Sequence, residues 1–122
     1  MKLIPFLALL AAPFAHASDR PFQCVSDYGS FHFEALGTLD GDRLTGEVTG
    51  NVYKDGRLFQ SAHSTPAASA FGEREKLEFT AKSLLVQVTV QTKFENGAYS
   101  GVMNVHSFLG GTPPMNTTCS VQ

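Results

Sequence analysis

The chain has 122 residues, of which 43% are hydrophobic and 16% charged, with a formal net charge of −2 and two cysteines. This length fits one domain with a single core, and the composition is that of a folded chain. The mild acidity, without runs of Lys and Arg, argues against nucleic acid or an anionic membrane surface as partner, because both attract clustered basic residues.

Residues 1–17 have the pattern of a cleaved export signal. Lys2 supplies a positive charge, residues 3–12 form an apolar run, and Ala-His-Ala at 15–17 provides the small residues of a cleavage site. The run is shorter than the roughly 20 residues that span a bilayer, so we expect no membrane span after cleavage. An uncleaved membrane anchor is the alternative. The expected mature protein is a single β domain, residues 18–122, in the periplasm or secreted.

The two cysteines lie near the two ends of this expected domain. Cys24 and Cys119 would meet an oxidising compartment after export, where paired cysteines are the rule. No C-x-x-C arrangement is present, so nothing indicates a redox-active pair. The sequence therefore predicts a Cys24–Cys119 disulfide that joins the first and last strands.

Turn signals along the chain predict an all-β fold. Asp40-Gly41, Asp55-Gly56 and Asn96-Gly97 each separate segments rich in β-branched and aromatic residues, which is a strong hairpin pattern. Lys82-Ser83 is expected to make a fourth tight connection. The strands expected between and beyond these turns are 22–26, a strand that starts at Phe31, 43–53, 76–81, 84–94, 98–108 and 116–121.

Period-two alternation assigns the faces of these strands. In 84–94, the side chains expected to face the core are Leu84, Val86, Val88 and Val90. In 43–53, the residues expected on the inward face are Leu44, Gly46, Val48, Gly50 and Val52. Glycines on an inward face allow the sharp bending that a barrel requires.

Seven or eight strands joined by short turns, with the terminal strands linked, predict a small antiparallel up-and-down barrel or a strongly curled meander. A β-sandwich is the alternative. The chain has no Trp, and its consecutive tight hairpins leave little chain for the long connections of an immunoglobulin-like sandwich.

Two segments interrupt the strand pattern. Residues 61–75 form either a short helix over 65–72, which Thr65 would cap and Gly72 would end, or an irregular loop. Residues 107–115 are expected to form a loop, because Gly110-Gly111 and Pro113-Pro114 do not belong in a strand interior.

The apolar loop 107–115 is the expected functional element, since loops on a rigid β scaffold are common binding sites. Its side chains either fold over an open end of the barrel and complete the core, or protrude to contact a partner. The residues expected to make that contact are Phe108, Leu109, Pro113, Pro114 and Met115.

No catalytic or metal-binding motif stands out. His32, His63 and His106 are scattered without ligand-like spacing, and no G-x-S-x-G occurs. We therefore expect no cofactor, no metal and no enzymatic activity.

Two function classes remain. The first is an exported non-enzymatic binding module that engages a protein partner, as an inhibitor does. The second is a lipocalin-like carrier of a small apolar ligand inside the barrel. The volume of the inward side chains discriminates between them: the set formed by Phe31, Phe33, Phe79, Val86, Val88 and Val90 would fill the interior, whereas Gly37, Gly46, Gly50 and Gly101 would leave space.

Overall fold

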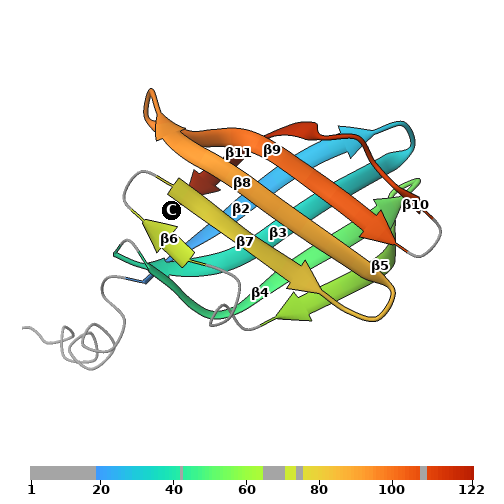
Figure 1. Ribbon diagram of the computed structural model, residues 1–122, viewed down its shortest axis with the longest axis horizontal. Coiled ribbons are helices and arrows are strands. Elements are labelled where there is room, and N and C mark those ends of the chain that lie inside the picture. Colours follow the sequence, from blue (N-terminus) through green and yellow to red (C-terminus); the bar gives the residue numbers. More distant parts are fainter. Residues whose placement is uncertain (1–18, 42, 65–70, 74–75, 108–109) are drawn as a thin grey trace, which may run out of the picture.

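The computed structural model describes residues 19–41, 43–64, 71–73, 76–107 and 110–122 (Figure 1). The expected export signal lies outside these residues. Within them the regular structure is all strand, and no helix is long and apolar enough to cross a membrane. The strands are β2 (Asp19–Tyr28), β3 (Phe31–Asp40), β4 (Arg43–Lys54), β5 (Arg57–Ser64), β6 (Phe71–Glu73), β7 (Lys76–Lys82), β8 (Val86–Glu95), β9 (Ala98–Ser107), β10 (Gly110–Gly111) and β11 (Met115–Val121).

These strands form one antiparallel sheet that curls into a nearly closed barrel (Figure 1). The spatial order is β5-β4-β3-β2-β11-β9-β8-β7-β6, with β10 paired to β9. Because β2 and β11 are paired, the barrel closes between the first and last strands, as predicted. The ladder is interrupted between β5 and the β6–β7 pair, where the Lys82 N–H donates to the Ser64 hydroxyl over 2.8 Å. A single continuous sheet replaces the alternative of a two-sheet sandwich.

The predicted disulfide is confirmed. Cys24 on β2 lies directly opposite Cys119 on β11 in the ladder, and the two sulfur atoms are bonded across a sequence separation of 95 residues. Both side chains are buried. The bond therefore links the two strands that close the barrel, and it indicates an oxidising environment.

The predicted hairpin turns are also confirmed. Asp55 and Gly56 have φ angles of 52° and 82°, and Asn96 and Gly97 have φ angles of 53° and 85°. Two successive positive φ angles match the twist of the flanking strands, which explains the Asp-Gly and Asn-Gly pairs. The sequence reading did not identify the turn at Gly29, which joins β2 to β3 with a φ of 63°.

The barrel interior is packed with side chains. Its core includes the side chains Phe22, Phe33, Leu39, Val48, Leu77, Phe79, Val88, Val90 and Met103. The inward glycines do not leave a hollow, because large neighbours cover them. A Cβ at Gly37 would lie 2.6 Å from the Phe22 ring, and one at Gly50 would lie 2.8 Å from the Val88 side chain. Among the described residues, the balance of side-chain volume therefore favours a filled barrel.

The expected inward orientation of Gly46 is wrong. The β3–β4 register shifts between Leu36 and Thr38, and more residues of β4 than of β3 lie between the flanking pairs. Gly46 lies in this bulge with a φ of 69° and is exposed. A bulge changes which face a residue occupies, so strict alternation holds only from Val48 to Val52.

The expected inward orientation of Leu84 is also wrong, because β8 begins two residues later, at Val86. The Ser83 N–H donates to the Val86 carbonyl over 2.9 Å. The Ser83 hydroxyl accepts bonds from the N–H groups of Leu85 and Val86. These bonds make residues 83–86 a closed turn, and Leu84 at its tip is 100% exposed.

The two irregular segments contain more strand than expected. Of the segment 61–75, residues 61–64 complete β5 and Phe71–Glu73 form β6, while residues 65–70 and 74–75 lie outside the described part. Residues 71 and 72 are strand, so of the two alternatives a helix that extends to residue 72 is wrong, and the choice between helix and loop over 65–70 lies outside the described residues. In 107–115, Gly110 and Gly111 pair with Ser107 and His106 as a short edge strand. The prediction that these two glycines lie in a loop is therefore wrong.

Candidate functional site

One end of the barrel gathers most of the exposed apolar side chains of the described chain. The turns β2–β3, β4–β5 and β7–β8 lie at this end, on the right of Figure 1, together with β10 and the end of β9. We call it the apolar end. Of the seven large hydrophobic residues exposed in the described chain, five lie on these turns or beside them: Tyr28, Leu58, Phe59, Leu84 and Leu85. Exposed apolar groups that gather in one region indicate an interaction surface.

The β7–β8 turn carries two apolar side chains, Leu84 and Leu85, that its hydrogen bonds do not need. The hydrogen bonds of the turn use the Ser83 hydroxyl and backbone groups, so they do not require apolar residues at 84 and 85. Leaving a leucine side chain in water forgoes roughly 1.5–3 kcal/mol of burial free energy. Neither Leu84 nor Leu85 is buried in the described structure.

Phe59 reaches the surface through a β-bulge. In the β4–β5 ladder Val52 pairs with Gln60 and Tyr53 pairs with Leu58, so Phe59 is an extra residue on β5. Bulges of this kind redirect a side chain and are frequent near functional sites. The Phe59 ring is 53% exposed and packs edge-on against Phe31, with 6.4 Å between the ring centroids.

A cavity of about 370 Å³ opens between these turns. Its floor is made by four core side chains, Phe33, Val52, Val86 and Val105. Its sides include Tyr28, Phe31 and Phe59 from β2, β3 and β5, and Gly110 and Thr112 from the segment after β9. The volume is at the small end of the range of about 300–1,000 Å³ for ligand pockets.

The segment 110–112 is held against the barrel wall next to this cavity. The Thr112 N–H donates to the Val105 carbonyl over 2.9 Å, and the Thr112 hydroxyl accepts from the Val105 N–H over 3.2 Å. The Ser107 hydroxyl donates to the Gly110 carbonyl over 3.1 Å. These bonds fix the backbone on both sides of residues 108–109.

The five expected contact residues have different placements. Phe108 and Leu109 lie outside the described residues, between two positions, Ser107 and Gly110, that border the cavity. Pro113 and Pro114 are exposed. Met115 is only 6% exposed and belongs to the core, so its side chain offers little surface to a partner.

The exposed residues Leu58, Phe59, Leu84 and Leu85 of the apolar end were not predicted from the sequence. Two features of the sequence could have indicated them. Leu58-Phe59 and Leu84-Leu85 are adjacent apolar pairs, and neighbouring residues of a strand point to opposite faces. Within a strand, one member of each pair would therefore face outward unless the strand is covered on both sides; in the structure Leu84 and Leu85 lie in a turn, where neither is buried. Such pairs mark exposed apolar groups even without a structure.

Polar side chains line the outer wall of β2, β3 and β4. Glu34 accepts hydrogen bonds from the Gln23 amide at 2.9 Å and from the Tyr53 hydroxyl at 3.0 Å. The bond to Glu34 is the main cause that raises the pKa of Tyr53 above its usual value near 10. His32 shares a 2.8 Å hydrogen bond with Asp27. No group of three or more His, Cys, Asp or Glu side chains in the described chain could hold a metal ion.

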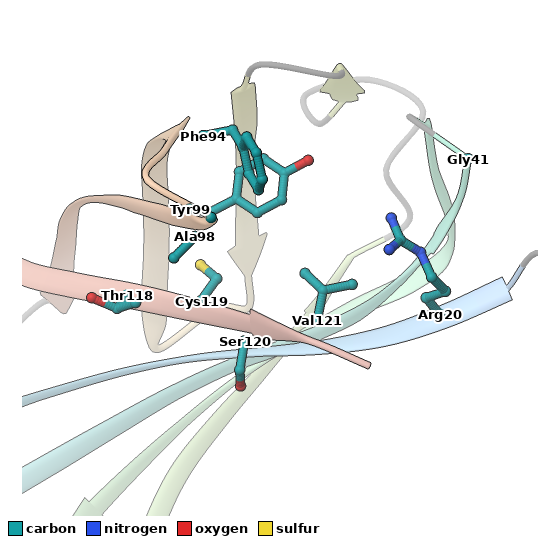
Figure 2. A pocket seen from close by; sticks show the side chains of 10 residues that line it. Arg20, Gly41, Phe94, Ala98, Tyr99, Thr118, Cys119, Ser120 and Val121 are labelled. Carbon is teal, nitrogen blue, oxygen red and sulfur yellow. The ribbon is translucent and has the colours of Figure 1, made fainter.

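A larger cavity, of about 880 Å³, lies at the opposite end of the barrel. Figure 2 shows the Phe94 and Tyr99 rings against each other on one side and Arg20 and Val121 on another. Residues 1–18 and 42, the sequence neighbours of positions that border it, lie outside the described residues. We assign no site there, because most of the large exposed hydrophobic residues of the described chain lie at the apolar end.

Comparison with protein-family models, with curated proteins and with solved structures finds no match to this chain. Any function must therefore be inferred from the geometry of the chain itself.

Proposed function

We propose that this protein is an exported, non-enzymatic binding module that engages a protein partner through the apolar end of its barrel, in the manner of an inhibitor. The observation that supports this most is the exposed Leu84-Leu85 pair in a turn whose hydrogen bonds do not need it. Apolar residues that the fold does not bury are explained by a surface that is buried on binding.

The breadth of the apolar end favours a protein over a small ligand. Leu58 and Leu84 do not line the cavity, so a ligand inside it would leave both exposed. A protein surface that covers the cavity and its surroundings would bury them together. The rigid strands below the turns reduce the entropy lost on binding.

The proposed location is the periplasm or the extracellular space. Two features support it: the Cys24–Cys119 disulfide, which persists under oxidising conditions, and the export-signal pattern of residues 1–17.

A lipocalin-like carrier is the second candidate, and the cavity of about 370 Å³ at the apolar end favours it. The filled interior restricts where a ligand could bind, since Phe22 covers Gly37 and Val88 covers Gly50. A carrier of this architecture would hold its ligand at the end of the barrel and not along its axis.

A matched pair of substitutions tests the proposal. Phe59 and Phe94 are 53% and 47% exposed, and each ring packs edge-on against one other aromatic ring, but they lie at opposite ends of the barrel. Cross-linking of the mature protein in its own exported fraction should capture a partner with wild type and with Phe94→Ser. Phe59→Ser should reduce that capture at least tenfold, as expected for loss of a buried aromatic contact.

Equal capture by both variants would contradict the proposal. Native mass spectrometry of the same purified protein distinguishes the carrier. A small bound mass that is lost on unfolding, and that is absent from Phe59→Ser, would favour a carrier over a module that binds a protein.

A further inference from the structure

The cavity at the apolar end has a preformed aromatic wall. The Phe31 and Phe33 rings are stacked, with 6.0 Å between their centroids and 14° between their planes. Phe59 meets the Phe31 ring at 60°. Since each ring is held by another, the wall does not need to be ordered when a ligand enters, which lowers the cost of binding. A flat or branched apolar group is the chemistry that such a wall accepts.

A single charged side chain, Lys54, borders this cavity in the described chain. Its ammonium nitrogen lies 5.8 Å from the centroid of the Phe31 ring, within cation–π range. No carboxylate in the described residues forms an ion pair with it. The ammonium therefore lies beside the aromatic wall without an ion-pair partner among the described residues, on a chain whose net charge is −2.

We infer that this cavity is the specificity pocket of the proposed interface, and that it takes an aromatic or branched apolar side chain of the partner with an Asp or Glu neighbour that pairs with Lys54. The inference rests on the proposed function. Charge complementarity assigns the carboxylate, and the aromatic wall assigns the apolar group. Leu58 and Leu84 lie beyond the cavity lining. They would contact further surface of the same partner, so we assign an internal segment of a folded protein and not a free chain end.

Short peptides test the chemistry directly. The probes are Gly-Gly-Phe-Glu-Gly-Gly and its Phe-Gln and Ala-Glu versions, all acetylated and amidated so that each carries one charge or none. Binding to the ¹⁵N-labelled mature protein is followed through amide chemical shifts. A single bulky side chain and one carboxylate support only weak binding, in the millimolar range.

We expect the Phe-Glu peptide to shift the amides of Lys54, Phe59 and Gly111. It should bind about two- to fivefold tighter than the Phe-Gln peptide at low salt, which is the strength of an exposed ion pair. The difference should shrink as salt is added. The Ala-Glu peptide should produce no shifts at these positions.

Lys54→Gln and Lys93→Gln form the matched pair of variants. Both lysines are exposed, and Lys93 lies toward the opposite end of β8, so neither change should affect folding. Lys54→Gln should make the Phe-Glu and Phe-Gln peptides bind equally, whereas Lys93→Gln should preserve the preference for Phe-Glu.

Three results would overturn the inference: equal binding of Phe-Glu and Phe-Gln to wild type, shifts outside the apolar end, or no binding of any peptide at 10 mM. Binding to vesicles of equal parts zwitterionic and anionic lipid that is lost in Lys54→Gln would assign the surface to a membrane instead. The peptide results alone do not decide the proposed function, which is tested separately by the effect of Phe59→Ser on partner capture.

Discussion

The β7–β8 turn at the apolar end differs from the turns at the opposite end. At the opposite end, Gly41, Asn96 and Gly97 have positive φ angles, so the backbone explains each residue type. At the apolar end, the β7–β8 turn exposes Leu84 and Leu85, which its hydrogen bonds do not require. Residues with positive φ angles are therefore required by the backbone, whereas Leu84 and Leu85 are not required by the hydrogen bonds of their turn. Residues of the second kind are where a function not visible as a motif should be sought.

The strands between the two ends form a barrel whose stability depends on the disulfide. Of the changes proposed here, removal of this bond should cause the largest loss in the free energy of unfolding. Cys24 and Cys119 close a loop with a separation of 95 residues. Reduction, or a double change to alanine, should lower the free energy of unfolding by up to about 4–5 kcal/mol. Urea unfolding measures this loss, and the reduced wild type serves as a control for the double variant. An unchanged midpoint would show that terminal-strand pairing alone holds the barrel closed.

A second test asks whether the cavity at the apolar end continues into the barrel. Gly50→Val places a branched side chain where a Cβ would already lie 2.8 Å from Val88. Overpacking of this kind should cost about 1–3 kcal/mol, measurable by urea unfolding. Stability equal to or above that of wild type would reveal space inside the barrel and would strengthen the carrier as a candidate.

The two turns themselves provide a third, smaller test. Asn96→Ala puts alanine at a φ of 53°, which should destabilise the protein by about 1–2 kcal/mol. Leu84→Ser at the apolar end should change stability by less than about 0.5 kcal/mol, because the side chain is fully exposed. Thermal unfolding of both variants checks the contrast. A large loss of stability in Leu84→Ser would mean that this leucine supports the fold.

The outer wall between the ends gives the smallest expected effect. The hydrogen bond to Glu34 raises the pKa of Tyr53. The stabilisation it provides is present below the unfolded-state pKa near 10 and is lost as the pH rises through the folded-state value. Glu34→Gln should therefore lower the pKa of Tyr53, as followed by the ring signals of this residue in an alkaline NMR titration. Tyr53→Phe identifies those signals. A pKa that does not change in Glu34→Gln would exclude this bond as the cause.

Much of the fold follows from the sequence for local reasons. Asp55-Gly56 and Asn96-Gly97 are the residue pairs that tight hairpins demand, and the alternation of Val86, Val88 and Val90 marks a half-buried strand. The export-signal pattern and the two cysteines were enough to predict the disulfide. These signals are strong because each depends only on neighbouring residues or on the compartment.

The errors arise where contacts between strands override the local pattern. The bulge on β4 between Thr45 and Thr49 moves Gly46 out of the interior, and the bulge on β5 turns Phe59 toward the cavity. Both depend on how two strands are paired, which alternation in one strand does not specify. The cavity was missed for the same reason, because it requires three turns, Ser107 and residues 110–112 to meet at one end.

The most direct test of the account is amide hydrogen exchange of the mature protein, alone and bound to the partner captured from its exported fraction. We expect slower exchange in the bound state at 28–31, 54–59, 83–86 and 110–112, with no change at 94–99 and 118–121. Slower exchange confined to 94–99 and 118–121 would contradict it and would place the binding surface at the opposite end of the barrel.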